Sequence, residues 1–306
     1  MSYSFKYKIN KNNYETVLGD SIEKLKYIKD ETVDLVIADP PYFKTINQKW
    51  DYEWKTNSLY LDWTKKWTAE IIRVLRKGGT FYLFGYFRTL SHILTDLKNS
   101  ELSFRQQIVI DKGLRSISGR KTSTYKLFPN VTESILFFIK DNKQFIKPLL
   151  KERQEKLMLS SKKINELLGV KANGGGMWSI YTGKNICEQL PTKEFWNKLQ
   201  QILKFKFPYN KIAQTFNIIK GYTDVWTDID FYEENKFHPT QKPLKLIDRL
   251  VLSSSNKNDL VLDPFGGSGS TIISCIKNNR NCITVEKDKS YFEIINQRIK
   301  SIIKSS

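Results

Sequence analysis

The 306-residue sequence predicts an α/β fold with a mostly parallel, doubly wound sheet. Two observations carry this prediction. Short apolar stretches alternate with segments of helical periodicity, as in chains of repeated strand and helix units. Two of these stretches, residues 34–38 and 259–263, end directly in motifs rich in Asp, Pro and Gly. Because ligand sites of open α/β sheets form where parallel strands end, we expect both motifs at one edge of the sheet.

The remaining elements follow from periodicity, caps and glycine stops. A helix expected at residues 60–76 ends at Lys77-Gly78-Gly79, which is a typical C-terminal stop. The expected strands are residues 14–20, 34–38, 80–85, 107–111, 133–140, 259–263 and 282–286. The other expected helices are residues 21–28, 87–98, 151–168, 193–203, 244–253, 272–278 and 290–303.

Composition limits the class of protein. Lys and Arg number 50 against 32 Asp and Glu, a net charge of +18, which favours a polyanionic partner such as nucleic acid. No apolar run approaches the roughly 18 residues of a membrane-spanning helix, and no secretory leader opens the chain. We therefore expect a cytoplasmic protein with no membrane partner. Three cysteines without a close pair and only two histidines argue against a disulfide framework and a metal centre.

The Asp-Pro-Pro-Tyr stretch at residues 39–42 carries groups suited to chemistry on a planar, amino-bearing ring. A nucleobase amine shares its lone pair with the ring, so its N–H groups need acceptors as the nitrogen becomes pyramidal. Asp39 offers a carboxylate, and Pro40 a carbonyl that Pro41 keeps out of helical geometry. Tyr42 offers a ring face on which a flipped base can stack. The alternative is a plain strand-to-loop turn.

Positive charge is concentrated in two stretches. Residues 112–126 contain five cations and no acid, and their place beside the tetrapeptide favours contact with phosphates over a merely solvated loop. The five cations are Lys112, Arg115, Arg120, Lys121 and Lys126. Residues 141–220 hold 15 Lys or Arg against 6 Asp or Glu and interrupt the strand rhythm. They are expected to form a second, mainly helical recognition module, with a solvated lysine-rich region as the alternative.

A glycine-rich turn at residues 264–271 follows the strand that ends at Asp263. It lacks the full spacing of a dinucleotide fingerprint, but its glycines still let a cofactor approach the backbone and the next helix. Glu286 ends the following strand, where nucleotide-binding α/β units place the acid that takes the ribose hydroxyls. The turn and Glu286 together predict a nucleotide-type cofactor site.

These motifs together resemble the S-adenosylmethionine-dependent DNA amino-methyltransferases of the permuted β group, in which the catalytic motif precedes the cofactor motif. Residues 39–42 match the first motif and residues 263–269 the second. Gly19-Asp20 and the His-Pro-Thr-Gln-Lys-Pro segment at residues 238–243 match the pattern too. The resemblance covers residues 14–140 and 236–300. It implies a seven-stranded Rossmann-like sheet in which residues 133–140 form the one antiparallel strand.

The resemblance also implies an activity and a set of residue roles. The activity is that of a type II-like enzyme that flips an adenine from double-stranded DNA and methylates its N6 amine. Residues 1–140 would form the catalytic half, 141–235 the target-recognition region and 236–306 the cofactor-binding half. The implied catalytic residues are Asp39, Pro40, Pro41 and Tyr42. The implied S-adenosylmethionine-binding residues are Asp20, Asp39, Thr240, Lys242, Asp263, Phe265, Gly266, Gly267, Ser268, Gly269 and Glu286, with Thr240 and Lys242 near the cofactor carboxylate.

Other functions remain open at this point. The same fold acts on the cytosine N4 amine, although such enzymes more often carry Ser at the position of Asp39. Related enzymes methylate RNA or protein amides, and a catalytically inactive DNA-binding module is a further alternative. A restriction endonuclease partner and a homodimer are suggested only by the habit of the family. The roles of Trp50, Trp54 and His238 are open.

Overall fold

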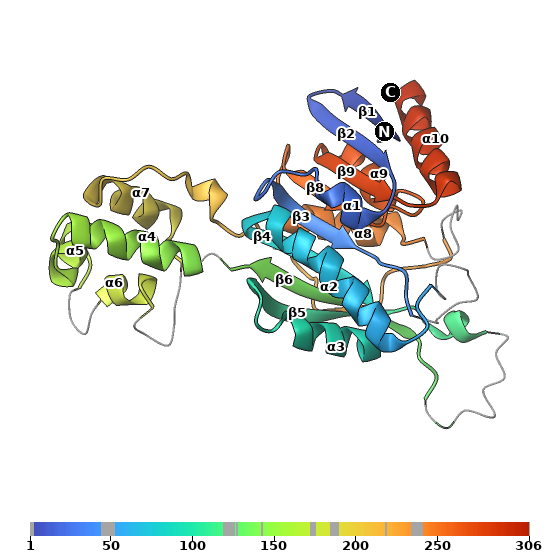
Figure 1. Ribbon diagram of the computed structural model, residues 1–306, viewed down its shortest axis with the longest axis horizontal. Coiled ribbons are helices and arrows are strands. Elements are labelled where there is room, and N and C mark those ends of the chain that lie inside the picture. The colour runs from blue at the N-terminus through green and yellow to red at the C-terminus, as the bar shows by residue number, and fades with distance from the viewer. Residues whose placement is uncertain are drawn as a thin grey trace. The chain divides into compact units, whose positions relative to one another are not determined.

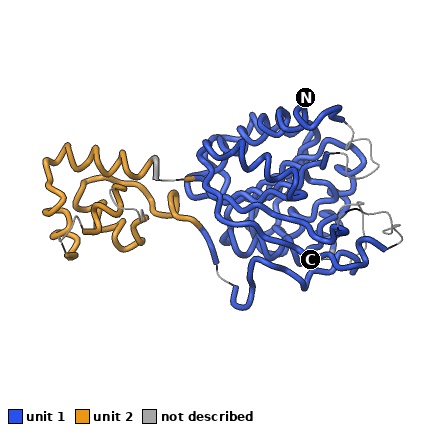
Figure 2. The backbone as a smooth tube through the Cα atoms, turned by 90° about the horizontal axis from the view of Figure 1, so that it is seen from below, with its two compact units in different colours: residues 1–140, 215–306 blue, residues 141–214 orange. Residues whose placement is uncertain are grey.

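The computed structural model describes residues 3–43, 53–118, 126, 128–141, 143–171, 176–183, 190–217, 219–233 and 241–305. The chain forms two compact units, shown in Figure 2. Unit 1 comprises Met1–Lys140 and Thr215–Ser306, and unit 2 comprises Asp141–Gln214. The predicted recognition region at residues 141–235 is therefore longer than unit 2, because the chain after Gln214 packs with unit 1.

One nine-stranded sheet forms the centre of unit 1, in the order β1-β2-β9-β8-β3-β4-β6-β5-β7 (Figure 1). The strand β6 is antiparallel to both its neighbours, β4 and β5, as predicted for residues 133–140. The predicted α/β class is confirmed. The strands are β1 (Tyr3–Ile9), β2 (Asn12–Leu18), β3 (Val33–Ala38), β4 (Leu75–Gly85), β5 (Leu102–Asp111), β6 (Thr132–Lys140), β7 (Val225–Trp226), β8 (Leu260–Asp263) and β9 (Asn281–Glu286).

The prediction of seven strands with one antiparallel member was wrong at the two edges of the sheet. The strand β1 pairs antiparallel with β2, and β7 pairs parallel with β5. The sequence of β1 alternates aromatic or aliphatic residues with polar ones, a period-two signal that sequence analysis overlooked. With only two residues, β7 is too short for any pattern to predict.

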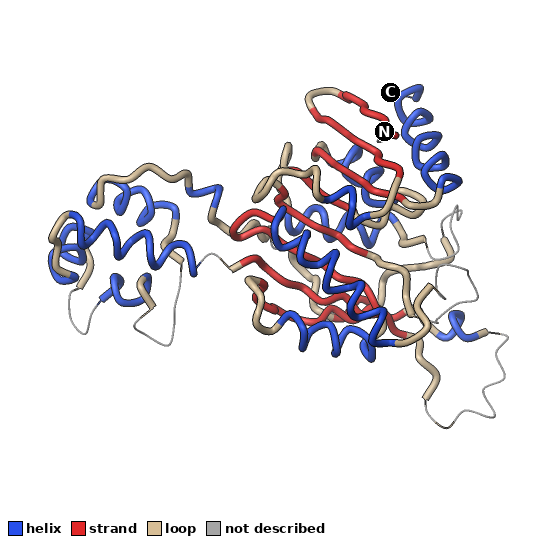
Figure 3. Tube along the Cα trace, in the orientation of Figure 1, coloured by secondary structure: helices blue, strands red, loops and turns tan. Residues whose placement is uncertain are grey.

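Helices cover both faces of the sheet, as the prediction of a doubly wound fold requires (Figures 1 and 3). On β3, Val36 and Ala38 belong to the core on one face, whereas Leu35 and Ile37 belong to the core on the other. This two-sided burial explains why the strand is apolar at successive positions. One face carries α1 (Ser21–Leu25), α2 (Asn57–Val74) and α3 (Phe87–Leu97). The other carries α8 (Leu244–Ser254), α9 (Ser270–Asn278) and α10 (Lys289–Ser305).

The helix α2 begins and ends earlier than the predicted residues 60–76. Thr56 caps its first turn by accepting a hydrogen bond from the Leu59 backbone N–H. The helix stops at Val74 because the chain turns directly into β4, and Gly78 then takes a positive φ of 73° within the strand. The glycines therefore shape the strand entry rather than the helix end.

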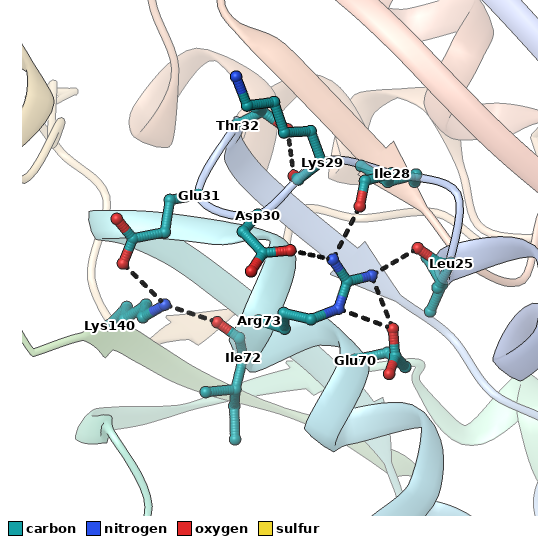
Figure 4. Close-up of polar contacts among 10 residues, drawn as sticks. All are labelled: Leu25, Ile28, Lys29, Asp30, Glu31, Thr32, Glu70, Ile72, Arg73 and Lys140. Carbon is teal, nitrogen blue, oxygen red and sulfur yellow. Dashed lines mark hydrogen bonds and ion pairs between the residues drawn. The ribbon is translucent and has the colours of Figure 1, made fainter.

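A polar network fixes the connection between α1 and β3, as Figure 4 shows. The Arg73 guanidinium of α2 donates to the backbone carbonyls of Leu25 and Ile28 and pairs with Asp30. Nearby, the side chain of Lys140 is only 3% exposed, and its ammonium donates to the Ile72 carbonyl at 2.8 Å. These contacts stabilise the edge of the sheet at which the parallel strands begin. The candidate site lies at the opposite edge, where those strands end.

Unit 2 is helical in its described part and has a core of its own that includes Trp178 and Trp196. The single helix predicted at residues 151–168 is two helices, because Met158 has a positive φ and Ser160 caps a new start. The helices are α4 (Lys143–Lys156), α5 (Ser161–Leu168), α6 (Gly176–Tyr181) and α7 (Lys193–Ile202), with a short 3-10 turn η4 (Tyr209–Lys211).

Candidate active site

A cavity of about 590 Å³ opens at the carboxyl edge of the sheet in unit 1. Its walls come from the ends of several strands, and β3 lies at its centre between β8 and β4. The chain continues from β3 to β4 on one side and from β8 to β9 on the other, so the cavity lies at the switch point of the sheet. Ligands of open α/β folds bind at such points.

All four residues of the Asp-Pro-Pro-Tyr stretch line this cavity. They follow the last residue of β3, and the side chain of Asp39 keeps 24% of its surface exposed. The hydroxyl of Tyr42 lies 2.9 Å from Asp39 Oδ1, and its ring packs edge-on against Tyr86, with centroids 5.3 Å apart. The stretch is therefore more than a turn, because its carboxylate faces the cavity.

Lys242 and Glu133 meet this stretch from two other parts of the chain. The Lys242 ammonium lies 2.8 Å from Asp39 Oδ2 and 3.0 Å from Glu133 Oε1. The Tyr42 hydroxyl also lies 2.5 Å from Glu133 Oε1. Glu133 is 4% exposed and Lys242 is 7% exposed, so both are more deeply buried in the cavity wall than Asp39. We call Asp39, Tyr42, Glu133 and Lys242 the carboxylate cluster.

The two acids of the cluster differ in their affinity for protons. Burial and the neighbouring charge of Glu133 raise the pKa of Asp39, although the Lys242 ammonium opposes this. Burial also acts to raise the pKa of Glu133, but the charges of Lys242 and Lys112 outweigh it and hold that pKa below its usual value. A proton that enters the cluster is thus held at Asp39 rather than at Glu133.

The glycine-rich turn after β8 forms the second wall of the cavity. The Gly267 backbone N–H donates to Glu286 Oε2 at 2.6 Å, and the Asp288 N–H donates to Oε1 at 2.7 Å. These bonds fix the direction of the Glu286 carboxylate at the end of β9. Burial raises the pKa of Glu286 to about 7 and the pKa of Asp263 to about 7.

The glycines of the turn serve different purposes. A Cβ on Gly266 would come within 2.6 Å of Thr284 Oγ1, so this residue lets the turn pack against β9. Gly267 has a φ of +52°, lines the cavity and would direct a Cβ into open space. Gly269 is the N-cap of α9 with a φ of +86° and is absent from the cavity wall. The turn therefore presents backbone to the cavity mainly at Gly267.

Most of the other predicted cofactor residues line the cavity, but Thr240 lies outside the described residues. Asp20 lines the cavity and also caps α1, accepting a hydrogen bond from the Ile22 N–H at 2.9 Å. Phe265 and Ser268 line it too, and Phe265 packs against Trp63 and Trp67 of α2. Thr240 and His238 lie outside the described residues. Lys242 lies on the cavity wall but pairs with Asp39 and Glu133.

The residues present fit a cofactor such as S-adenosylmethionine. Glu286 offers oriented carboxylate oxygens for a pair of hydroxyls, and Gly267 leaves open space at the backbone for close approach. Phe265 and Trp63 offer aromatic surface, and Asp263 offers an acid for an ammonium group. The volume also falls in the range of about 300–1,000 Å³ that small-molecule sites occupy.

The predicted phosphate-binding cations are only partly at the site. Lys112, just after β5, lines the cavity, with its ammonium 5.4 Å from the centroid of the Tyr86 ring. Arg115, in the 3-10 turn η2 (Leu114–Ile117), stacks on Tyr232 at 4.6 Å. Lys126 is exposed and is absent from the wall, and Arg120 and Lys121 lie outside the described residues.

The segment after β7 supplies a wall that the sequence did not predict. Phe231 and Tyr232 line the cavity. This segment is held by Arg249 of α8, whose guanidinium stacks on Trp226 at 4.6 Å and pairs with Asp228 at 2.6 Å. Residues that sequence analysis assigned to target recognition thus form part of the cavity in unit 1.

Sequence analysis missed Glu133, Tyr86 and Phe231 as members of the site. A signal for Glu133 existed, because an antiparallel strand has its first residue at the carboxyl edge of its parallel neighbours. Trp54, whose role was open, packs against Tyr60 and Trp63 and also borders the cavity. Trp50 lies outside the described residues.

The described residues hold neither a metal centre nor a membrane-spanning helix. No group of three His, Cys, Asp or Glu side chains there has the arrangement of a metal centre. None of the helices described is both long and apolar enough to cross a membrane.

Comparison with known proteins agrees with the fold. The Type II methyltransferase M.HpaI of Haemophilus parainfluenzae is 28% identical over 293 residues, which cover 93% of this chain and 74% of the relative. The DNA adenine methyltransferase YhdJ of Escherichia coli (strain K12) is 28% identical over 288 residues, covering 92% and 82%. The crystal structure of an M1.HpyAVI-SAM complex matches with a TM-score of 0.56 at 20% identity, covering 93% and 98% of the two chains.

The doubly wound sheet and its carboxyl-edge cavity define a Rossmann-like fold of the methyltransferase type. The chain belongs to the DNA methylase family, whose model matches residues 33–297. This match includes both the Asp-Pro-Pro-Tyr stretch and the glycine-rich turn.

Proposed function

We propose that this chain transfers a methyl group from S-adenosylmethionine to the N6 amine of adenine in double-stranded DNA. The observation that carries the proposal is the position of Asp39. Its carboxylate faces the same cavity as Glu286 and Gly267, so an amine acceptor and a nucleotide-type site share one space. Membership of the DNA methylase family supports DNA as the polymer, and similarity to a relative named as a DNA adenine methyltransferase supports adenine.

The chain's own residues have distinct tasks in this reaction. S-adenosylmethionine, when bound, supplies the methyl group. Asp39 and the Pro40 carbonyl accept the two N–H groups of the target amine, which keeps its nitrogen oriented as it becomes pyramidal. Tyr42 offers its ring to the flipped base, and the Lys242 ammonium fixes the Asp39 carboxylate by a 2.8 Å contact.

The cofactor residues are proposed from the geometry of the second wall. Glu286 would accept hydrogen bonds from the ribose hydroxyls, since backbone N–H groups already orient its oxygens. Asp263 would face the cofactor ammonium, and Phe265 and Asp20 would border the nucleoside. Lys242 is better suited to orient Asp39 than to bind the cofactor carboxylate, because its ammonium is held between two acids.

Lys112, Arg115 and Lys126 are proposed to contact DNA phosphates, together with Arg120 and Lys121 outside the described residues. The cavity-side position of Lys112 supports this for a flipped nucleotide. Unit 2, with its excess of lysine, is proposed as the main part of the target-recognition region. A partner endonuclease and a homodimer stay expectations from the family, and a cytoplasmic location stays an expectation from the sequence.

The strongest competing function is methylation of the cytosine N4 amine in the same cavity. Asp rather than Ser at residue 39 favours adenine, and so does the name of the relative in Escherichia coli. The test is to incubate the purified protein with duplex DNA and S-adenosylmethionine, digest the DNA to nucleosides and identify the methylated one by mass spectrometry. N6-methyl-2′-deoxyadenosine supports the proposal. N4-methyl-2′-deoxycytidine, or methylation of RNA and not of DNA, would overturn it.

A further inference from the structure

We propose that Glu133 is a positioning residue that allows Asp39 to take up the proton released by the target amine. The inference rests on the proposed function, because it concerns the same amine. It comes from three contacts within the carboxylate cluster and from the difference in exposure between its two acids.

The Tyr42 hydroxyl has one proton but lies between two acids. It is 2.5 Å from Glu133 Oε1 and 2.9 Å from Asp39 Oδ1. A hydroxyl donates once and accepts up to twice, so it can donate to only one of these acids at a time. When it donates to Glu133, the Tyr42 oxygen can accept a hydrogen bond from a protonated Asp39 Oδ1. The three groups then form a continuous hydrogen-bonded chain.

This arrangement accommodates the product state of the reaction. A primary amine that gains a methyl group must lose one proton, so an N–H bond breaks and an O–H bond forms on the Asp39 carboxyl group. The other oxygen, Oδ2, keeps its contact with the Lys242 ammonium at 2.8 Å. Oδ1 is therefore the oxygen that takes the proton, and its new O–H group donates a hydrogen bond to the Tyr42 oxygen. The Tyr42 O–H bond does not break, because the Tyr42 hydroxyl continues to donate its hydrogen bond to Glu133.

Exposure separates the roles of the two acids. Asp39 keeps 24% of its side chain exposed in the cavity, whereas Glu133, although it also lines the cavity, is only 4% exposed and is mainly engaged with Lys242 and Tyr42. The charged and titratable groups around Asp39 are Lys242, Tyr42, Glu133 and Asp263, and Lys112 lies beyond Glu133. Among these, Glu133 is the acid whose charge both anchors Lys242 and accepts from Tyr42.

Glu133→Gln tests the role, with Ser134→Ala as the matched control on the next residue of β6. Ser134 is equally buried, at 4%, and its hydroxyl accepts from Gln107. The assay is the single-turnover rate of methyl transfer to DNA between pH 5.5 and 9, with the dissociation constants of S-adenosylmethionine and DNA measured in parallel. If wild-type protein transfers no methyl group to adenine, the proposed function fails, and that result is distinct from a failure of this inference.

We expect Glu133→Gln to lower the rate at least about tenfold, the lower end of what a positioned acid–base group contributes, while both dissociation constants change less than twofold. Loss of the Glu133 charge lowers the pKa of Asp39, so the acid side of the pH–rate profile should move to lower pH. Ser134→Ala should keep the wild-type profile. A Glu133→Gln rate equal to wild type, or a lower rate with an unmoved acid side, would overturn the inference.

Tyr42→Phe provides a second test that does not depend on the folding of the Glu133 variant. It keeps the ring for stacking and leaves the ion pairs of Lys242 intact, but removes the hydroxyl between the two acids. The inference predicts a rate loss of at least about tenfold. Because Asp39 also loses a hydrogen-bond donor, the acid side should move to higher pH. A wild-type rate in Tyr42→Phe would refute the proposed hydrogen-bonded arrangement.

Discussion

The ammonium of Lys242 lies 2.8 Å from Asp39 Oδ2, which joins the segment before α8 to the first residue after β3. The contact is made at the point where the two halves of the sheet meet. Since β3 and β8 are adjacent strands, the catalytic and cofactor motifs are held by the same few residues. The same contacts therefore bear on the stability of the protein and on its reaction, and unfolding and rate measurements can test each.

Lys242→Met should destabilise the protein more than the loss of an exposed lysine. It leaves the acids Asp39 and Glu133 without their cation, and breaking a buried ion pair in this way costs about 3–5 kcal/mol. The control is Lys245→Met, because the Lys245 side chain is 54% exposed and its pair with Asp228 contributes at most about 1 kcal/mol. Urea unfolding at pH 7.5 measures both, and equal losses for the two variants would contradict the prediction.

Affinity for S-adenosylmethionine should rise as the pH increases from 6 to 8. The pKa of Glu286 is raised to about 7 by burial, so the group is mainly protonated at pH 6 and ionised at pH 8. The ionised form is the better acceptor for hydroxyl groups, so binding below pH 7 must expel a proton. A single such linkage changes the dissociation constant by about tenfold over this range.

Calorimetry at several pH values tests the role of Glu286 directly. Glu286→Gln should bind more weakly at pH 8 and show a smaller change with pH, because the titrating group is gone. The pH dependence of binding that remains in Glu286→Gln is attributed to Asp263, because burial also raises the pKa of Asp263 to about 7. An affinity of the wild-type protein that is constant from pH 6 to pH 8 would rule out this assignment.

Lys112→Ala should weaken DNA binding in a salt-dependent manner. If its ammonium neutralises one phosphate, the slope of the logarithm of affinity against the logarithm of salt concentration falls by about 1. Lys98→Ala is the control, since Lys98 is exposed at the end of α3 and is absent from the cavity wall. Fluorescence anisotropy with a labelled duplex gives both slopes, and an unchanged slope for Lys112→Ala would remove it from the DNA interface.

Much of the fold and half of the site could be predicted from local sequence. Residues that end buried strands, such as Asp39 and Glu286, are found by their position after an apolar run, because strand direction places them at one edge. Glu133 was missed for the reverse reason, since it begins a strand that runs the other way. Its place at the carboxyl edge depends on the pairing of β6 with β4, which is a tertiary property.

Other misses also come from long-range contacts. Phe231 reaches the cavity because β7 pairs with β5 and Arg249 anchors the segment that follows β7. A two-residue strand gives no periodic pattern in the sequence. The sequence therefore predicts that Phe231 belongs to the recognition region. Lys242 was predicted beside a cofactor carboxylate, and its contact with Asp39 depends on how β3 and β8 lie together.

The most direct test of the central claim is the rate of methyl transfer by Asp39→Ala. The claim is that the Asp39 carboxylate accepts the target amine, so its removal should lower the single-turnover rate on duplex DNA by about 10²–10³. The dissociation constant of S-adenosylmethionine should stay close to that of the wild-type protein, measured by calorimetry on the same preparation. A variant that keeps the wild-type rate with unchanged cofactor binding would contradict the claim.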